Sequence, residues 1–221
     1  MKDSIIISSL IIFFIVLSYS CQDRSEKPIE FQVSQGVMNQ MDFDTLGLQK
    51  GDNLPSLKLS TVDGEQKRFD SGPRQKPLLL INGSYTCDIT RSQVPSIQRI
   101  FEKYKGEIDI YLIHTLEAHP SDTPSPYSAE PEPWLAADNI ANGISAKQPK
   151  TVSQRQDLAK KWINRDKLTT PVLIDGPKNE FWQKAGEAPN MAILINKEGK
   201  VAAKQSWYQE EELEEAIQGE L

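Results

Sequence analysis

The 221-residue chain has only two cysteines and two histidines, and their spacing is not that of a zinc site. It also lacks a basic stripe, since 25 Lys and Arg residues face 31 Asp and Glu residues, for a net charge of −6. No apolar run reaches the roughly 20 residues that a membrane-spanning helix needs. These absences exclude a disulfide-rich scaffold, and they predict neither a metal site nor a nucleic-acid partner.

The N-terminus is the most apolar part of the chain. Residues 5–17 are apolar except for two serines, and these 13 residues have the length of the core of a secretory signal. Small residues then lead to Cys21. Residues 1–20 therefore resemble a lipoprotein signal peptide, with Cys21 as the lipidated residue. This predicts a bacterial protein anchored in the cell envelope, and Gln22 favours the outer membrane over another periplasmic face. Ordinary cleavage nearby and an uncleaved anchor are the alternatives.

The rest of the chain divides into a polar tether over residues 21–50 and a periodic domain over residues 51–221. Within the domain we expect alternating elements. Strands are predicted at 57–62, 66–69, 77–82, 108–114, 172–174, 191–195 and 201–205, and helices at 87–104, 151–166, 179–185 and 210–218. Residues 115–150 contain six prolines and predict a long Pro-rich loop insertion, in which Tyr127 and Trp134 favour a folded cap.

This order predicts an α/β fold, with a mixed central sheet flanked by helices on both faces and opened by an N-terminal β-hairpin. It resembles the thioredoxin-like fold in its redoxin branch. In that resemblance Pro95 matches the proline of the active-site helix, eight residues after Cys87. Pro189 matches the cis-proline loop that faces the reactive sulfur, and an ordinary loop proline is the alternative.

Cys87 stands where a buried strand gives way to a helix. The first N–H groups of a helix are unpaired and stabilise a thiolate, so we predict a thiol pKa below the ordinary value of about 8.5. Arg91, one turn further on, strengthens this effect and Asp88 opposes it. If Cys21 carries lipid, Cys87 has no partner in the chain, and it is either a reactive nucleophile or a buried inert residue.

Thr90 stands where a Cys-x-x-Cys pair has its second cysteine. Because threonine cannot form a disulfide, an oxidised Cys87 must be resolved by another molecule's thiol. The expected partners are therefore a small-molecule substrate and an external thiol or thioredoxin-like reductant, with no further cofactor.

Two motifs resemble the iodothyronine deiodinase family, whose members have a thioredoxin fold and a Gly-Ser-Cys-Thr-selenocysteine motif. Residues 82–87 read Asn-Gly-Ser-Tyr-Thr-Cys, and residues 117–122, after a predicted strand, read Glu-Ala-His-Pro-Ser-Asp. The resemblance covers residues 78–208. It implies that Cys87 occupies the selenocysteine position. It further implies a catalytic pair, Glu117 and His119, and matches at Gly83, Ser84, Thr86 and Arg155.

The chain also departs from this family. Tyr85 stands at the position of an auxiliary cysteine, and no second histidine follows His119. A role for His119 is supported independently, because the strands that lead to it and to Cys87 are neighbours and should end at one sheet edge. An imidazole there can donate a proton or stabilise a thiolate, and Glu117 could orient it or hold it protonated.

Three functions are compatible with this pattern. The first is an envelope thiol oxidoreductase that is deiodinase-like and includes reductive dehalogenation among its reactions. The second is a one-cysteine peroxidase, since Ser84 precedes Cys87 by three residues as in peroxiredoxins, although Leu80 replaces their upstream proline. The third is a non-catalytic thioredoxin-like binding module. The residues expected to support the site around Cys87, His119 and Glu117 are Ser84, Thr86, Thr90, Arg91, Arg155 and Pro189.

Overall fold

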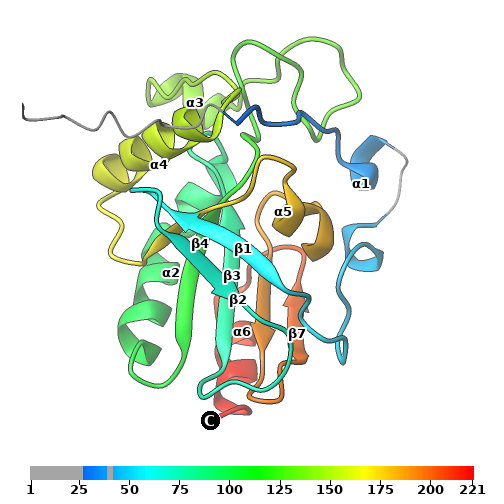
Figure 1. The fold of residues 1–221 in the computed structure, drawn as a ribbon. Coiled ribbons are helices and arrows are strands. Elements are labelled where there is room, and N and C mark those ends of the chain that lie inside the picture. The colour runs from blue at the N-terminus through cyan, green and yellow to red at the C-terminus, as the bar shows by residue number, and fades with distance from the viewer. Residues whose placement is uncertain (1–26, 39–41) are drawn as a thin grey trace, which may run out of the picture.

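The computed structural model describes residues 27–38 and 42–221, and a seven-stranded mixed sheet forms the centre of this part of the chain (Figure 1). The predicted signal peptide over residues 1–20 and the predicted lipidation site Cys21 lie outside the described residues. The strands are β1 Leu57–Thr61, β2 Gln66–Phe69, β3 Leu78–Gly83, β4 Asp109–His114, β5 Val172–Ile174, β6 Ala192–Ile195 and β7 Val201–Gln205.

The order of the strands across the sheet is β2-β1-β5-β4-β3-β6-β7. β3, β4 and β5 are parallel, and the β1–β2 hairpin joins β5 in antiparallel orientation. The β6–β7 hairpin joins the other side of β3, also antiparallel. Every strand and helix predicted from the sequence is present, with small shifts at the ends.

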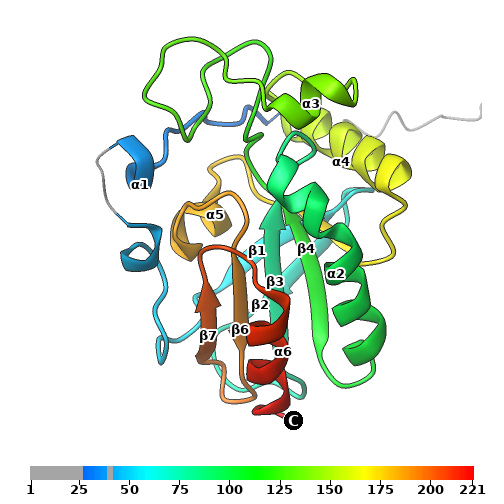
Figure 2. The same cartoon turned by 180° about the vertical axis from the view of Figure 1, so that it is seen from behind.

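Helices cover both faces of this sheet. They are α1 Gln35–Met38, α2 Asp88–Tyr104, α3 Ala137–Ala141, α4 Val152–Asp166, α5 Glu180–Ala185 and α6 Glu210–Gln218, with a 3-10 turn at Phe43–Thr45. α2, α4 and α6 pack on one face, which Figure 2 shows from the side of α2 and α6. α5 packs on the opposite face together with Phe43.

The central strand β3 shows why its sequence is a continuous apolar run. Leu79 and Ile81 point into the core under α2, α4 and α6, whereas Leu78 and Leu80 point into the core under α5. All four side chains have no exposed surface. Burial on both faces therefore removes the polar alternation that a half-exposed strand would show.

α2 begins shortly after β3 ends and packs along the sheet. Its buried stripe includes Val94, Ile97, Ile100 and Tyr104, which follow helical spacing. Pro95 lies inside the helix and has no N–H to donate to the preceding turn, as expected for the proline in this position. Both ends of α2 are thus fixed by packing against the sheet.

The segment before β1 differs from the predicted polar tether over residues 21–50. Pro28 forms a β-bridge with Thr151, and the backbone N–H of Ser34 donates to the carbonyl oxygen of Pro126 at 2.8 Å. Phe43 is 8% exposed and belongs to the core beneath α5. Because Phe43 is buried by distant parts of the chain whereas Phe31 and Val33 are exposed, no local periodicity marks this segment as folded. We call residues 27–38 and 42–50 the N-terminal segment.

The Pro-rich loop, residues 115–150, is an ordered part of the domain and contains α3. It passes over the same end of the sheet as residues 27–38 of the N-terminal segment (Figures 1 and 2). Leu116, Ser125, Tyr127 and Ile144 are buried within it, as the predicted cap requires. Across residues 27–38 and 42–221, none of the helices combines the length and the apolar character needed to cross a bilayer.

Candidate active site

Cys87 lies at the junction of β3 and α2, where it is the N-cap residue of the helix. Its sulfur accepts hydrogen bonds from the side chain of Thr90 and from the backbone N–H of Thr90, the latter at 3.4 Å. The Thr90 hydroxyl in turn accepts a hydrogen bond from Nδ2 of Asn190 at 3.2 Å, which leaves its own hydrogen for the sulfur. A Cβ atom at Gly83 would come within 2.4 Å of Thr90, so glycine permits this packing.

Cys87 is 1% exposed, and this burial raises the pKa of its thiol to about 11. The hydrogen bonds from Thr90 lower the pKa by a smaller amount, and the negative charges of Asp88 and Glu117 raise it further. The predicted pKa below the ordinary value is therefore wrong for this state of the protein. Loss of water around the thiolate outweighs the favourable field of the helix N-terminus.

Arg91 does not approach the sulfur as the sequence predicted. Its guanidinium donates to the carbonyl oxygen of Tyr85 at 3.2 Å and to the carboxylate of Asp138 at 2.6 Å. Only 6% of its side chain is exposed. Arg91 therefore ties α2 to α3 in the Pro-rich loop.

Cys87 forms part of the wall of a cavity of about 250 Å³. The other lining residues come from the N-terminal segment, the start of α2, the Pro-rich loop and the ends of β6 and β7, and they are Phe43, Asp88, Ile89, Ala118, His119, Tyr127, Trp134, Pro189 and Trp207. The cavity thus brings Cys87, His119 and Pro189 together, as the sequence predicted, and surrounds them with aromatic rings.

Both ring nitrogens of His119 face hydrogen-bond acceptors. Nδ1 lies 2.9 Å from the carbonyl oxygen of Trp134, and a carbonyl can only accept, so Nδ1 carries a hydrogen. Nε2 lies 3.3 Å from Oδ1 of Asp88. The imidazole is also edge-on to the ring of Trp134, with centroids 4.5 Å apart. His119 is therefore held in an orientation that presents Nε2 beside Asp88 in the cavity wall.

Glu117 does not contact His119, which differs from the predicted pair. Its Oε1 lies 2.8 Å from Nε2 of His114, and its Oε2 accepts hydrogen bonds from Thr86. Burial alone raises the pKa of Glu117, but His114 and the hydrogen bonds from Thr86 outweigh that cost and lower it. β4 ends at His114, so the alternation that would have placed positions 117 and 119 on one face does not continue to them.

Ser84 and Thr86 join the loop before Cys87 to the loop that carries His119. The hydroxyl of Ser84 accepts from the backbone N–H of Ala118 at 3.1 Å. The hydroxyl of Thr86 accepts from the backbone N–H of His119 at 3.0 Å and donates to Glu117 at 2.6 Å. These two side chains therefore position the cysteine and histidine loops relative to each other.

Pro189 reaches the cavity through a loop that Asn82 holds. Nδ2 of Asn82 donates to the carbonyl oxygen of Ala188 at 2.7 Å, and Oδ1 accepts from the backbone N–H of Met191. No cis peptide bond occurs in the described residues, so the Ala188–Pro189 bond is trans and differs from the cis-proline of the resemblance. The shape of this loop depends instead on Asn82 and on the left-handed backbone of Glu187, at φ +64°.

Comparison with known proteins identifies the family. The family model for iodothyronine deiodinase matches residues 21–213. The chain belongs to the iodothyronine deiodinase family. Thyroxine 5-deiodinase of Ovis aries is 34% identical over 85 residues, which are 36% of this chain and 29% of that protein. The Homo sapiens protein of the same name is 33% identical over 84 residues, 35% of this chain and 28% of that protein. These alignments span less than a third of the relatives' length.

Solved structures support the fold of this deiodinase-family protein. A thiol-disulfide oxidoreductase from Bacteroides fragilis superposes with a TM-score of 0.52 and 17% identity, covering 77% of this chain and 100% of that chain. A peroxiredoxin-like protein from Aquifex aeolicus gives a TM-score of 0.52 and 15% identity, covering 80% and 91%. At such identities the likeness concerns the fold alone, and it confirms the predicted thioredoxin-like fold.

Arg155, which the family resemblance marked as a site residue, does not line the cavity. Its guanidinium donates to the carbonyl oxygens of Asp175 and Gly176 and to Oδ1 of Asn179, at 3.1, 3.2 and 2.7 Å. Burial lowers its pKa to about 10, and the charges of Asp175 and Glu117 oppose this shift. In this deiodinase-family chain Arg155 therefore holds the turn between β5 and α5.

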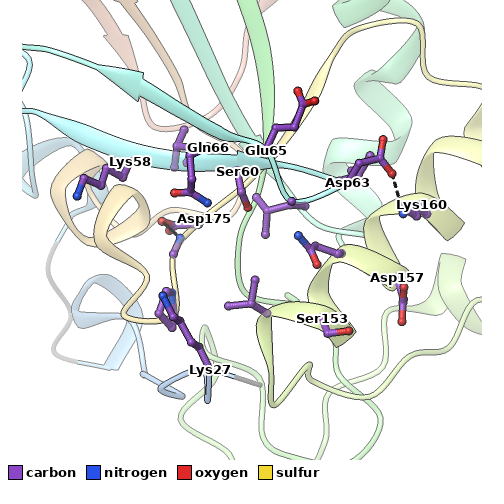
Figure 3. A pocket seen from close by; sticks show the side chains of 18 of the residues that line it. Lys27, Lys58, Ser60, Asp63, Glu65, Gln66, Ser153, Asp157, Lys160 and Asp175 are labelled. Atoms are coloured by element: carbon purple, nitrogen blue, oxygen red, sulfur yellow. Dashed lines mark hydrogen bonds and ion pairs between the residues drawn. The ribbon is translucent and has the colours of Figure 1, made fainter. Parts of the chain in front are cut away.

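A larger cavity, of about 680 Å³, lies between the β1–β2 hairpin, α4 and the β5–α5 turn (Figure 3). Its labelled lining is polar and of both charges, and Lys160 forms an ion pair with Asp63 across it at 2.9 Å. It contains neither cysteine nor histidine. The cavity at Cys87 is therefore the one suited to thiol chemistry.

Several site residues were missed by sequence reasoning. They are Phe43, Asn82, Asp88 as a partner of His119, His114 as a partner of Glu117, and Trp207. Asn82 carried a usable signal, because a polar amide inside a buried apolar run needs a specific partner. The others depend on contacts between distant parts of the chain, which no local pattern records.

Proposed function

We propose that this deiodinase-family protein is a thiol-dependent oxidoreductase that removes a halogen reductively from an aromatic substrate. One observation carries the proposal: Cys87, its single described thiol, and His119 line the same aromatic cavity. Aromatic walls favour a flat, polarisable ligand, and thiol chemistry needs the sulfur to face it. Family membership supports the reaction class.

In the proposed first step, the sulfur of Cys87 attacks the halogen and the carbon–halogen bond breaks. The electron pair of that bond remains on the ring carbon, which takes up one proton. The thiol proton passes to Nε2 of His119 and from there to the ring carbon, so the ring gains hydrogen and Cys87 becomes a sulfenyl halide. His119 serves as the base and then the acid, because its Nε2 faces the cavity wall beside Asp88.

The second half of the cycle requires an external thiol. A first thiol displaces halide from the sulfenyl halide and forms a mixed disulfide with Cys87. A second thiol then attacks this disulfide, which releases the oxidised reductant and restores the thiol of Cys87. Thr90 occupies the position of an internal resolving cysteine and hydrogen-bonds to the sulfur of Cys87, but it cannot form a disulfide. This supports the assignment of both reductive steps to an external thiol.

The raised pKa of Cys87 bears on the choice between functions. A peroxidase needs a thiolate before peroxide arrives, and the burial that raises the pKa to about 11 disfavours that state at neutral pH. A dehalogenase can lose the thiol proton after the substrate has entered. Peroxidase activity and a non-catalytic binding role are therefore outcomes that the test below distinguishes from dehalogenation.

The test measures iodide release from 4-iodophenol with dithiothreitol as the reductant. We expect one iodide per dithiothreitol oxidised, no release by Cys87→Ser, and a decrease of about 100-fold or more in kcat for His119→Ala. Thiol loss with peroxide but no iodide release would replace the proposal by the peroxidase. No reaction with either class of compound would favour the binding module.

The cellular site is a separate part of the proposal. We propose that lipid on Cys21 anchors the protein in the bacterial envelope, with the outer membrane favoured by Gln22. The wild-type protein should fractionate with membranes, and Cys21→Ser should shift it to the soluble envelope fraction. A mass spectrum of the N-terminal peptide without lipid would overturn this part while leaving the reaction untouched.

A further inference from the structure

The walls of the Cys87 cavity are formed by rings that pack against one another. The ring of Phe43 meets the ring of Trp207 edge-on at 5.8 Å and that of Tyr127 at 6.4 Å between centroids. The hydroxyl of Tyr127 is fixed on the outside of the cavity wall by a hydrogen bond from Nε1 of Trp182, at 2.9 Å. The side walls are therefore rigid as well as apolar, and the volume between them is limited.

This volume, about 250 Å³, decides how many aromatic rings can enter. A cavity of about 150 Å³ in another protein encloses benzene. The space beside Cys87 therefore holds one ring with a large substituent such as iodine. A second ring would have to remain outside, against the exposed parts of Trp134 and Trp207, which are 50% and 42% exposed.

The charges around the cavity disfavour an anionic ligand. No Lys or Arg is among its lining residues, and Arg91 is turned to Asp138. Asp88 places its carboxylate in the wall, 3.3 Å from His119. The buried carboxylate of Glu117 lies near enough to raise the pKa of Cys87. A carboxylate on the substrate would thus meet two like charges, and no Lys or Arg side chain lines the cavity to offset them.

We propose that the cavity selects uncharged halogenated phenols, that it excludes aromatic carboxylates, and that it encloses only one ring of a two-ring compound. The phenol hydroxyl donates to Asp88, and the halogen points toward Cys87. The inference rests on the proposed function for its choice of halogenated ligands.

Binding is tested with the Cys87→Ser protein, so that no reaction can occur. Calorimetric titration near neutral pH compares 4-iodophenol with 4-iodobenzoate, which differ in charge, and with 4-(4-iodophenoxy)phenol, which adds a ring. We expect 4-iodobenzoate to bind at least about tenfold more weakly than 4-iodophenol. We expect the two-ring ether to bind within about threefold of 4-iodophenol, since its second ring stays outside.

Two variants locate the selectivity. In the same Cys87→Ser background, Asp88→Asn should reduce the preference for 4-iodophenol over 4-iodobenzoate to about threefold or less. Asp63→Asn removes an equal charge in the larger cavity and should leave the preference unchanged. In the unmodified protein, bound 4-iodophenol should slow the alkylation of Cys87 by iodoacetamide, which would place the ligand beside the sulfur. An unchanged alkylation rate would overturn the proposed location.

The outcomes separate this inference from the proposed function. Equal or tighter binding of 4-iodobenzoate, or binding of the two-ring ether more than about tenfold tighter, overturns the selectivity. Selective binding of 4-iodophenol together with no iodide release by the unmodified protein overturns the dehalogenase and leaves the selectivity standing.

Discussion

Thr86 and Glu117 are joined by two hydrogen bonds to a single oxygen. The backbone N–H and the hydroxyl of Thr86 both donate to Oε2 of Glu117, at 2.7 and 2.6 Å, and both residues are fully buried in the loops that follow β3 and β4. Thr86 directly precedes Cys87, and its hydroxyl also accepts from the backbone of His119. Together with Ser84, the Thr86 hydroxyl therefore sets the relative position of nucleophile and histidine.

Replacing Thr86 by valine tests this dependence. Thr86→Val keeps the backbone bond to Glu117 but removes the hydroxyl that connects Glu117 with the His119 backbone. We expect a loss of about 1–3 kcal/mol in the free energy of unfolding, measured by urea denaturation. Thr86→Ser retains the hydroxyl and should recover most of the stability and the kcat for iodide release. Equal kcat values for both variants would contradict the positioning role.

Glu117→Gln removes the charge that faces His114. The variant should lose about 1–3 kcal/mol of unfolding free energy, because the single amide oxygen of glutamine cannot replace both carboxylate oxygens, which face His114 and Thr86. The pKa of Glu117 is lowered in the folded protein, so its stabilising contribution is present above the unfolded value of about 4.3 and is lost as pH falls below it. In urea denaturation, lowering the pH from neutral to about 4 should therefore reduce the free energy of unfolding more in the wild type than in Glu117→Gln.

A double-mutant cycle isolates the Glu117–His114 pair. His114→Phe alone should also destabilise the protein, since it leaves Glu117 without its imidazole partner. In the double variant the loss should be smaller than the sum of the single losses by about 1 kcal/mol or more. Strict additivity would show that the two side chains act independently.

The raised pKa of Cys87 predicts slow alkylation at neutral pH. In the native protein the rate of reaction with iodoacetamide should rise with pH toward a midpoint near 11, whereas the unfolded chain should give a midpoint near about 8.5. Because the folded state holds the thiol proton more tightly, this contribution to stability is complete below about pH 8.5 and is lost as pH rises toward the folded pKa. A native midpoint below that of the unfolded chain would contradict the burial seen here.

Thr90→Cys should convert the site into one that resolves itself. Thr90 already contacts the sulfur of Cys87 through its backbone N–H and its side chain, so a second thiol would lie beside the first. We expect an intramolecular disulfide, seen as the loss of two titratable thiols after mild oxidation, and insulin reductase activity with dithiothreitol. Thr90→Ser is the matched control and should show neither. Persistence of two free thiols would mean that their geometry does not permit the bond.

The sheet and its helices could be predicted because their signals are local. The apolar run of β3, the helical stripe of α2 and the turn at residues 63–64 each reflect burial over a few residues, and all appear in the structure. The motif that contains Cys87 and the one that contains His119 could be placed at one sheet edge by topology alone. The family resemblance marked Cys87, His119 and Glu117, of which the structure brings Cys87 and His119 into one cavity and leaves Glu117 outside it.

The errors share a physical origin in long-range burial. The end of β4 at His114 gave Glu117 a different partner, which no spacing rule indicates. The sequence shows the helix N-terminus at Cys87, which lowers the thiol pKa, but it does not show the burial of the sulfur, which raises that pKa by more. The predicted direction of the pKa shift was therefore wrong. Arg91 was assigned to the site by its position one turn after Cys87 and Arg155 by the family resemblance, yet Arg91 ties α2 to α3 and Arg155 holds the turn between β5 and α5.

The folding of the N-terminal segment onto the domain matters for anyone who prepares the protein in shortened form. A version that begins at Gly51 would keep all seven strands and would look complete on a topology diagram. It would nevertheless lack Phe43 from the cavity wall and the backbone N–H of Gln35, which donates to Glu187 beside the Pro189 loop at 2.7 Å. In such a protein the sulfur of Cys87 would be exposed to water. The pKa measured for its thiol would then differ from that of the protein with the N-terminal segment in place.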